Sequence, residues 1–306
     1  TKSEKRYFKI FCFTQNISKN YLRLFEAIDN QDDPDEKALK EKFAGETFAR
    51  QLHVTKNYLN QLILKSLRNY HSNISKKAQL KDCLRNVEIL FLKELYDQCH
   101  YELLRAEKLA RQYQRLPDML EVLHWKKRLL LVTRGNDTAA LNELIRKEEA
   151  VVSELNQIIS YWDITANIFE YSKAKDGRFF QNACKVRQNA SIPAEVLRYH
   201  ILYTHYTISG QPELGLVQLE KLVQLLEQRP DYIRDDPGAY TTALNNQISS
   251  LVFMRRYETV QALLNKVKSV PEEYKLHSDS LFTIKLQLRT YNIELELYRD
   301  TRQWDK

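Results

Sequence analysis

Amphipathic, helix-forming segments fill this chain of 306 residues, and turn-like breaks interrupt them about every forty residues. The steps between breaks range from about 34 to about 47 residues, a spacing typical of stacked helical hairpins. One hairpin cannot bury its own apolar face, so hairpins stack on their neighbours and form a solenoid with a concave binding surface. The spacing therefore predicts an α-solenoid. The breaks lie near Tyr101, Thr138, Arg178, Pro212, Tyr257 and Trp304.

The chain contains only 6 glycines and 7 prolines, far fewer than average usage. Glycine supplies the positive backbone angles that tight β-hairpin turns require. No long stretch alternates apolar with polar residues, as a half-buried strand would. We therefore predict an all-α fold.

The sequence divides into two expected domains. Residues 1–78 form a small helical domain that ends in a polar stretch, and residues 79–306 form the helical repeats. Within the repeats, 87–116 reads as two helices that meet near Cys99–Tyr101. The rhythm of the breaks also predicts a second helix after Trp304, so we expect the native chain to continue and its last hairpin to be incomplete here.

Two segments carry the local pattern of a known repeat class. CHYELLRAEKLARQY (99–113) places Tyr101 at a turn and Ala110 at a close-packing position, and ISGQPELGLVQLEKLVQLL (208–226) places Gly210 at a small-residue turn position. Both segments resemble tetratricopeptide repeats, and the resemblance extends over about residues 80–306. It implies that the first helices of the hairpins line a concave groove that binds a peptide or a segment of a partner protein.

Tyrosines and carboxamides are the candidate binding groups of that groove. Tyrosine combines a large contact area with a polar tip. Asn245, Asn246 and Gln247 interrupt an otherwise apolar helix, and carboxamides in a groove can pair with the backbone of an extended peptide. The alternative is that the tyrosines fill gaps between helices. The residues predicted to contact a peptide are His200, Tyr203, Thr207, Asn246, Arg255, Asn292 and Arg299.

A second pattern lies in TFARQLHVTKNYLNQLILKSL (47–67). Phe48, Ala49 and Leu52 would pack a first helix, His53–Val54 would form a turn, and Thr55 would cap a second helix. The segment resembles the helix-turn-helix of bacterial transcription regulators, closest to the arabinose-regulator type. With the repeats that follow, it also resembles peptide-sensing regulators of Gram-positive bacteria.

Leu59 and Leu62 of the second helix would face the core, which leaves its polar side chains outside. Such side chains could read base edges and hold phosphates in a major groove. The alternative is an ordinary helical hairpin with a polar outer face. The predicted DNA-contacting residues are Lys56, Asn57, Tyr58, Asn60, Gln61 and Lys65.

The net charge of +7 is unevenly spread: residues 1–75, 76–190 and 191–306 carry +4, +4 and −1. This basic excess suits an acidic partner or nucleic acid, and equally a solvated helical surface. The four cysteines, Cys12, Cys83, Cys99 and Cys184, show no paired spacing, which argues against structural zinc and disulfides and suits a reducing interior. No window approaches the ~18 apolar residues of a membrane span, and residues 1–13 are too charged for a signal peptide. We expect a cytoplasmic protein without a membrane segment.

Glu121/His124 and Asp97/His100 have the spacing of di-iron ligands on one helix face, but no further bridging carboxylates are identifiable. The sequence also lacks a glycine-rich phosphate loop, a nucleophile elbow and a recognisable Cys/His pairing. We therefore expect no metal, no cofactor and no enzymatic activity. The first hypothesis is a scaffold that binds a protein or peptide on its concave face. The alternative is a DNA-binding regulator whose repeats sense a ligand or form a dimer, and the oligomeric state is left open.

Overall fold

The computed structural model describes residues 1–72, 75–135, 137–173, 190–276 and 281–300. These residues form α-helices and one short 3-10 helix, and no strand occurs among them. The prediction of an all-α fold is confirmed, whereas the tetratricopeptide-like solenoid stays a prediction. In the described part of the chain, no helix is both long enough and apolar enough to cross a bilayer.

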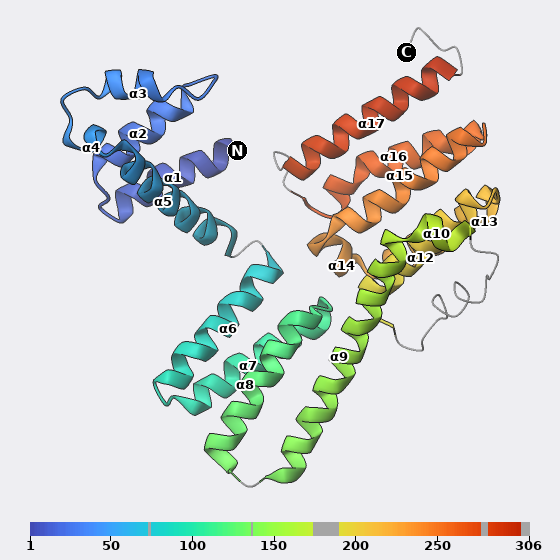
Figure 1. Cartoon of the computed structure of the whole chain (residues 1–306), viewed down its shortest axis with the longest axis horizontal. Helices are drawn as coiled ribbons and strands as arrows, with labels where there is room; N and C mark the ends of the chain where they lie inside the picture. Colours follow the sequence, from blue (N-terminus) through green and yellow to red (C-terminus); the bar gives the residue numbers. More distant parts are fainter. Residues whose placement is uncertain (73–74, 136, 174–189, 277–280, 301–306) are drawn as a thin grey trace. The chain divides into compact units, whose positions relative to one another are not determined.

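The chain divides into two compact units, Thr1–Gln79 and Leu80–Lys306, where the sequence suggested a boundary after residue 78. In the first unit, α5 packs against α1, α2 and α4 (Figure 1). Phe8, Leu24, Leu39, Leu52 and Leu59 come from four different helices and meet in one apolar core. The helices of this unit are α1 (Lys2–Thr14), α2 (Lys19–Asp29), α3 (Glu36–Lys42), α4 (Thr47–Arg50) and α5 (Leu52–Ser72).

In the second unit, most helices pack against their neighbours in sequence: α7 on α8, α8 on α9, α12 on α13, α15 on α16 and α16 on α17. Helix α13 also packs on α15, from which the short α14 separates it in sequence. Helix α9 also packs on α12, which joins the earlier helices to the later ones. The helices, of which α6 begins just before the unit, are α6 (Lys76–Leu92), α7 (Tyr96–Gln112), α8 (Leu116–Arg134), α9 (Thr138–Ala166), α10 (Ile168–Lys173), α12 (Ile192–Ile208), α13 (Pro212–Glu227), α14 (Pro230–Asp235), α15 (Pro237–Phe253), the 3-10 helix Tyr257–Thr259, α16 (Val260–Glu273) and α17 (Leu281–Asp300).

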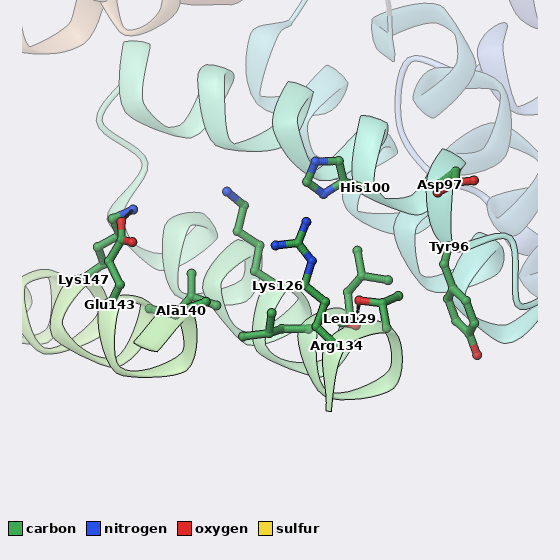
Figure 2. A pocket seen from close by; sticks show the side chains of 12 residues that line it. Tyr96, Asp97, His100, Lys126, Leu129, Arg134, Ala140, Glu143 and Lys147 are labelled. Carbon is green, nitrogen blue, oxygen red and sulfur yellow. Dashed lines mark hydrogen bonds and ion pairs between the residues drawn. The ribbon is translucent and has the colours of Figure 1, made fainter. Parts of the chain in front are cut away.

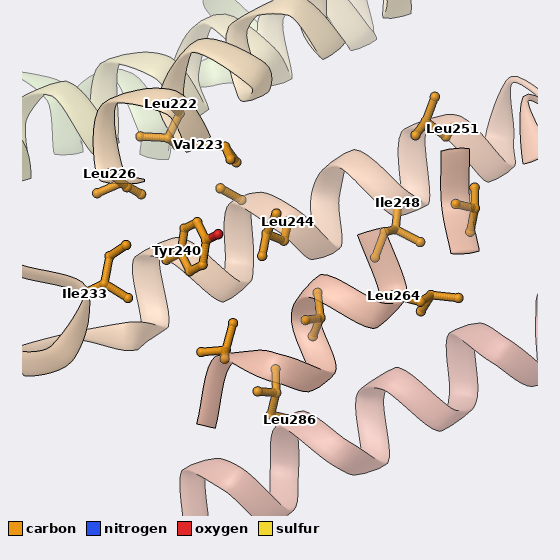
Figure 3. Close-up of a cluster of buried hydrophobic side chains, with 14 of the residues drawn as sticks. Leu222, Val223, Leu226, Ile233, Tyr240, Leu244, Ile248, Leu251, Leu264 and Leu286 are labelled. Atoms are coloured by element: carbon orange, nitrogen blue, oxygen red, sulfur yellow. The ribbon is translucent and has the colours of Figure 1, made fainter. Parts of the chain in front are cut away.

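Helix α15 lies at the centre of the larger apolar core of this unit (Figure 3). Tyr240, Leu244 and Ile248 of α15 are almost completely buried among side chains of α13, α14, α16 and α17. The hydroxyl of Tyr240 is 2.8 Å from Glu227 Oε1 of α13, so the one polar atom of that buried ring has a partner. A second core joins α6, α7 and α8 and includes Leu80, Val87, Leu103 and Val122.

Gly215 sets the close approach of α12 and α13. A Cβ atom placed on it would lie 3.1 Å from the Tyr203 carbonyl oxygen and 3.1 Å from Thr207 Oγ1. Contacts that short force a shift of the neighbouring helix, so a larger residue here would separate the two helices. The small residue at this position explains how α12 and α13 come to share the most extensive helix–helix contact of the described chain.

One turn geometry recurs along the chain. A residue with positive φ follows the helix, and the next N–H donates to the carbonyl five residues earlier, at 2.8–3.0 Å. This is the Schellman arrangement, in which the left-handed residue is usually glycine. Among the described turns of this kind, only the one at Gly210 has glycine at the left-handed position. The left-handed residues are Asn16, Glu94, Gln114, Gly210, Arg255 and Lys275.

The observed helix ends can be compared with the breaks expected from the sequence. Breaks near Thr138, Pro212 and Tyr257 match the ends of α8, α12 and α15 within a few residues. The expected junction at Cys99–Tyr101 is wrong, because these residues lie inside α7 and the turn is at Lys93–Leu95. Glu94 adopts the left-handed conformation there, and glutamate gives no break signal in a sequence. The expected breaks at Arg178 and Trp304 lie outside the described residues.

Replacing Glu94 by glycine should raise the free energy of unfolding by about 0.5–1 kcal/mol, because glycine adopts positive φ without steric cost. Glu88 offers the matched control, since it is exposed in the interior of α6. Glu88→Gly should lower the free energy of unfolding by about 1 kcal/mol, because glycine is a poor helix former. Urea unfolding of the two variants measures both changes, and equal losses would contradict the left-handed turn at Glu94.

Candidate functional site

The most enclosed helix of the second unit leaves one narrow row of side chains open to solvent. Most of α15 is buried, as its core position requires. Thr242, Ser249 and Phe253 are exposed and Asn246 is half-buried, and these four follow one another at steps of four, three and four residues, which places them on one face of the helix. Phe253 is 77% exposed, and Asn246 is half-buried. We call these four residues the α15 row.

The three consecutive amides of α15 have different surroundings. Asn245 is 2% exposed, and its Oδ1 atom has no hydrogen-bond partner within the described structure. Gln247 is also buried. Only Asn246 of the three belongs to the α15 row, so it is the carboxamide that a ligand can reach.

The predicted groove residues of α12 contribute to helix packing. Ser250 Oγ of α15 donates a hydrogen bond of 3.2 Å to the Tyr203 hydroxyl, which links α12 to α15. Thr207 Oγ1 donates to the Tyr203 carbonyl at 2.8 Å, beside Gly215 of α13. His200 is half-buried, and burial lowers the pKa of its imidazole. A lowered pKa keeps this histidine neutral at neutral pH.

The other predicted groove residues point elsewhere. Arg255 is the left-handed residue of the turn after α15, so it lies beyond the helix that carries Asn246. Asn292 and Arg299 are exposed on α17, on the side turned away from the buried Leu286 and Thr290. The structure therefore distributes the seven predicted residues over helix contacts, a turn and two exposed faces.

A pocket of about 400 Å³ lies between α7, α8 and α9 (Figure 2). Its walls include Asp97 and His100, one of the two carboxylate–histidine pairs seen in the sequence. In the described part of the chain, no group of three or more His, Cys, Asp or Glu side chains could hold a metal ion. The other carboxylate–histidine pair, Glu121 and His124, belongs to no such group either. Glu121 instead accepts a hydrogen bond of 3.1 Å from Lys81.

Basic side chains line the same pocket, but carboxylates neutralise them. Lys126 pairs with Glu107, and Lys147 pairs with Glu143 at 2.5 Å. Arg134 is 4.0 Å from Asp137. Arg134 and His100 both line the pocket (Figure 2). Because its cations are matched by nearby carboxylates, the pocket offers little net attraction for an anion.

The N-terminal unit does not form the expected helix-turn-helix. Helix α4 is only four residues long, and the break falls at Gln51. The predicted turn residues His53 and Val54 lie inside α5, which is 21 residues long. Thr55 is not a helix cap either: its hydroxyl donates to the carbonyls of Phe48 and Gln51, both at 3.2 Å. These expectations were wrong because no residue from Leu52 onward interrupts the helical pattern.

Most of the predicted DNA-contacting side chains are nevertheless exposed. Asn57, Asn60, Gln61 and Lys65 lie open on α5. Tyr58 is 47% exposed, and its ring centre lies 4.7 Å from that of Tyr21 of α2, with the two rings tilted by 42°. Lys56 pairs with Glu36 of α3 at 2.5 Å, and this hydrogen bond is the main cause that lowers the pKa of Glu36 to about 2. The charge of Lys56 is therefore already partnered.

The described cysteines are buried and free. Burial raises the pKa of Cys12 and Cys99, and it raises that of Cys83 to about 11. A thiol with a raised pKa is protonated at neutral pH and is a poor nucleophile. These side chains therefore act as small apolar groups in the cores.

No protein-family model matches the chain, and no curated protein or solved structure is significantly similar to it.

Replacing Asn245 by leucine should leave the free energy of unfolding unchanged or raise it by about 1 kcal/mol, because the change removes a buried oxygen without a partner. Asn246→Leu is the control and should change stability by less than about 0.5 kcal/mol, since Asn246 is half-open. Thermal unfolding of both variants tests this. A loss above about 1 kcal/mol for Asn245→Leu would show that the amide makes a stabilising hydrogen bond.

Proposed function

We propose that the protein is a non-enzymatic, tetratricopeptide-like scaffold that binds an extended segment of another protein along the α15 row. The observation that carries the proposal is that Thr242, Ser249 and Phe253 are exposed, and Asn246 is half-buried, on one face of a helix that is mostly buried. Aromatic rings provide large contact areas in protein interfaces, and a carboxamide can pair with the backbone of a bound peptide.

The dimensions of the row suit a short extended peptide. From Thr242 to Phe253 the helix rises about 16 Å, the length of about five residues of extended chain. The Asn246 carboxamide can donate to a peptide carbonyl and accept from a peptide N–H. Ser249 Oγ already donates to the Asn245 carbonyl at 2.9 Å, so its free lone pairs can only accept.

The arrangement of helices supports the repeat assignment. Successive helices of the second unit pack on their neighbours in sequence, as stacked hairpins do. A hydrogen bond between Ser250 and Tyr203 links α15 to α12, and in the proposed solenoid these two helices are the first helices of consecutive hairpins. The buried free thiols suit a reducing compartment, so we place the scaffold in the cytoplasm.

The proposal is tested by selecting peptides from a random display library on the immobilised protein, with counter-selection on an Asn246→Ala/Phe253→Ala double variant. Fluorescence anisotropy of a selected peptide should show that each single substitution weakens binding about tenfold or more, because each removes a central contact. The melting temperature should not change, since both side chains are solvent-accessible.

Gln224→Ala is the matched control, because Gln224 is an exposed amide on α13 outside the row. It should bind the selected peptide as the unaltered protein does. If no selected peptide binds the unaltered protein more tightly than the double variant, the α15 row is rejected as a binding surface.

A second candidate function is DNA binding through α5, and the exposure of Asn57, Asn60, Gln61 and Lys65 favours it. Asparagine and glutamine can pair with the adenine edge in the major groove, and lysine can contact phosphate. The short α4 and the pairing of Lys56 with Glu36 weigh against it. It therefore ranks below the scaffold.

DNA binding by α5 predicts opposite effects of two substitutions. Glu36→Gln should increase affinity because it releases Lys56, whereas Lys65→Ala should decrease affinity and reduce the salt slope by about one. Lys19→Ala, an exposed lysine on α2, should have little effect. Titration of labelled double-stranded DNA at low and physiological salt measures all three. Absence of binding at low salt would exclude this function.

A further inference from the structure

A cavity of about 370 Å³ is lined by the end of α7, the start of α8 and the middle of α9. It differs from the pocket of Figure 2, although Lys147 of α9 lines both. Ser191, directly before α12, also lines it. Gln114 Oε1 accepts a hydrogen bond of 2.6 Å from the Ile192 N–H, which ties the turn between α7 and α8 to the start of α12 at this cavity. We call it the α9 cavity.

Much of the lining of the α9 cavity is apolar. Ala110, Met119 and Leu123 line it and are at most 7% exposed, because they also belong to the core of α6, α7 and α8. Leu116 and Val151 add partly buried apolar surface. Side chains held in a packed core form walls that need no rearrangement, so the apolar body of a ligand can leave water there at little cost to the fold.

Glu154 of α9 is the carboxylate of the cavity, and one of its oxygens lacks a partner. Its Oε1 atom is shielded from solvent, and no described residue donates a hydrogen bond to it. A shielded carboxylate oxygen without a donor costs free energy, since it has lost water and gained no hydrogen bond. A ligand that brings an N–H group to Glu154 removes this cost.

The two cations that line the cavity are paired with other carboxylates. Arg111 donates to Glu107 at 2.7 and 3.2 Å, and Lys147 lies 2.5 Å from Glu143. The unpartnered oxygen of Glu154 therefore favours a ligand with a positive charge and disfavours an anion. A metal ion fits poorly, because the described residues hold no group of three or more His, Cys, Asp or Glu side chains that could bind one.

We propose that the α9 cavity binds a small hydrophobic amine, a molecule that carries a protonated amino group on a compact apolar body. The ammonium donates to Glu154, and the apolar body lies against Met119, Leu123 and Val151. The apolar walls favour such a molecule over the slender lysine side chain of a partner protein, which would cover little of them. This inference goes beyond the binding of protein segments proposed for the α15 row and does not depend on it.

The chain contains only two methionines, which gives the test a selective readout. Met119 lines the cavity, whereas Met254 directly follows α15. With both methionine methyl groups labelled with ¹³C, titration of 2-phenylethylamine should shift the NMR signal of Met119 and leave that of Met254 in place. Met119→Leu assigns the two signals, because this exchange nearly preserves side-chain volume.

Three further compounds test the chemistry of recognition. 2-Phenylethanol and 3-phenylpropanoate keep the aromatic ring but carry no positive charge, so each should bind at least about tenfold more weakly than 2-phenylethylamine. n-Butylamine imitates the tip of a lysine side chain and has little apolar surface. It should also bind at least about tenfold more weakly.

Glu154→Gln should weaken the binding of 2-phenylethylamine at least about tenfold, because it removes the charge and keeps the shape of the side chain. Glu149→Gln is the matched control, since Glu149 is an exposed glutamate of α9 outside the cavity. It should bind the amine as the unaltered protein does. Ala150→Phe places a ring at an exposed position of the lining and should block all four compounds.

A Met119 signal that the amine does not shift would overturn the proposal. Equal binding of the amine and 2-phenylethanol, or unchanged binding of the amine by Glu154→Gln, would have the same consequence. If n-butylamine bound as tightly as 2-phenylethylamine, the site would suit a lysine side chain, and the proposal of a hydrophobic amine would be wrong. A melting temperature lowered by more than about 5 °C in Glu154→Gln would also contradict it, because Glu154 would then have a partner within the protein.

Discussion

Burial of α15 is the interaction on which the second unit depends. Tyr240, Leu244 and Ile248 lie in contact with side chains of the surrounding helices and are almost completely removed from water. Burying a side chain of this size contributes about 1.5–3 kcal/mol, so the enclosure of α15 fixes how α13, α14 and α16 are spaced. That spacing also decides which residues of α15 stay accessible. The α15 row is therefore a consequence of the same packing that stabilises the unit.

The recurring turns show how packing can override local preference. Left-handed conformation costs a residue other than glycine roughly 1–2 kcal/mol, yet Glu94, Gln114, Arg255 and Lys275 adopt it. Each turn follows a helix whose apolar face is buried, and each satisfies helix carbonyls through the same pair of backbone hydrogen bonds. Helix burial and carbonyl satisfaction together outweigh the local strain.

The basic charge of the chain contributes less to its candidate sites than its net value suggests. Lys56, Lys126 and Lys147 each pair with a glutamate inside their own unit. Such pairs reduce the field that an anionic ligand would feel. The surfaces that remain are defined by exposed apolar and amide groups, which suits the recognition of protein segments.

The sequence by itself determined the helical class and most helix positions in the second unit, because helical periodicity and sparse glycine are local properties. Only the tertiary structure decided that Tyr203 and Thr207 serve helix packing, that the junction lies at Glu94 rather than Tyr101, and that α5 begins at Leu52. It also decided which helix faces of the described residues are buried. An amphipathic pattern shows that a face is apolar, but exposure depends on neighbours brought together from distant parts of the chain.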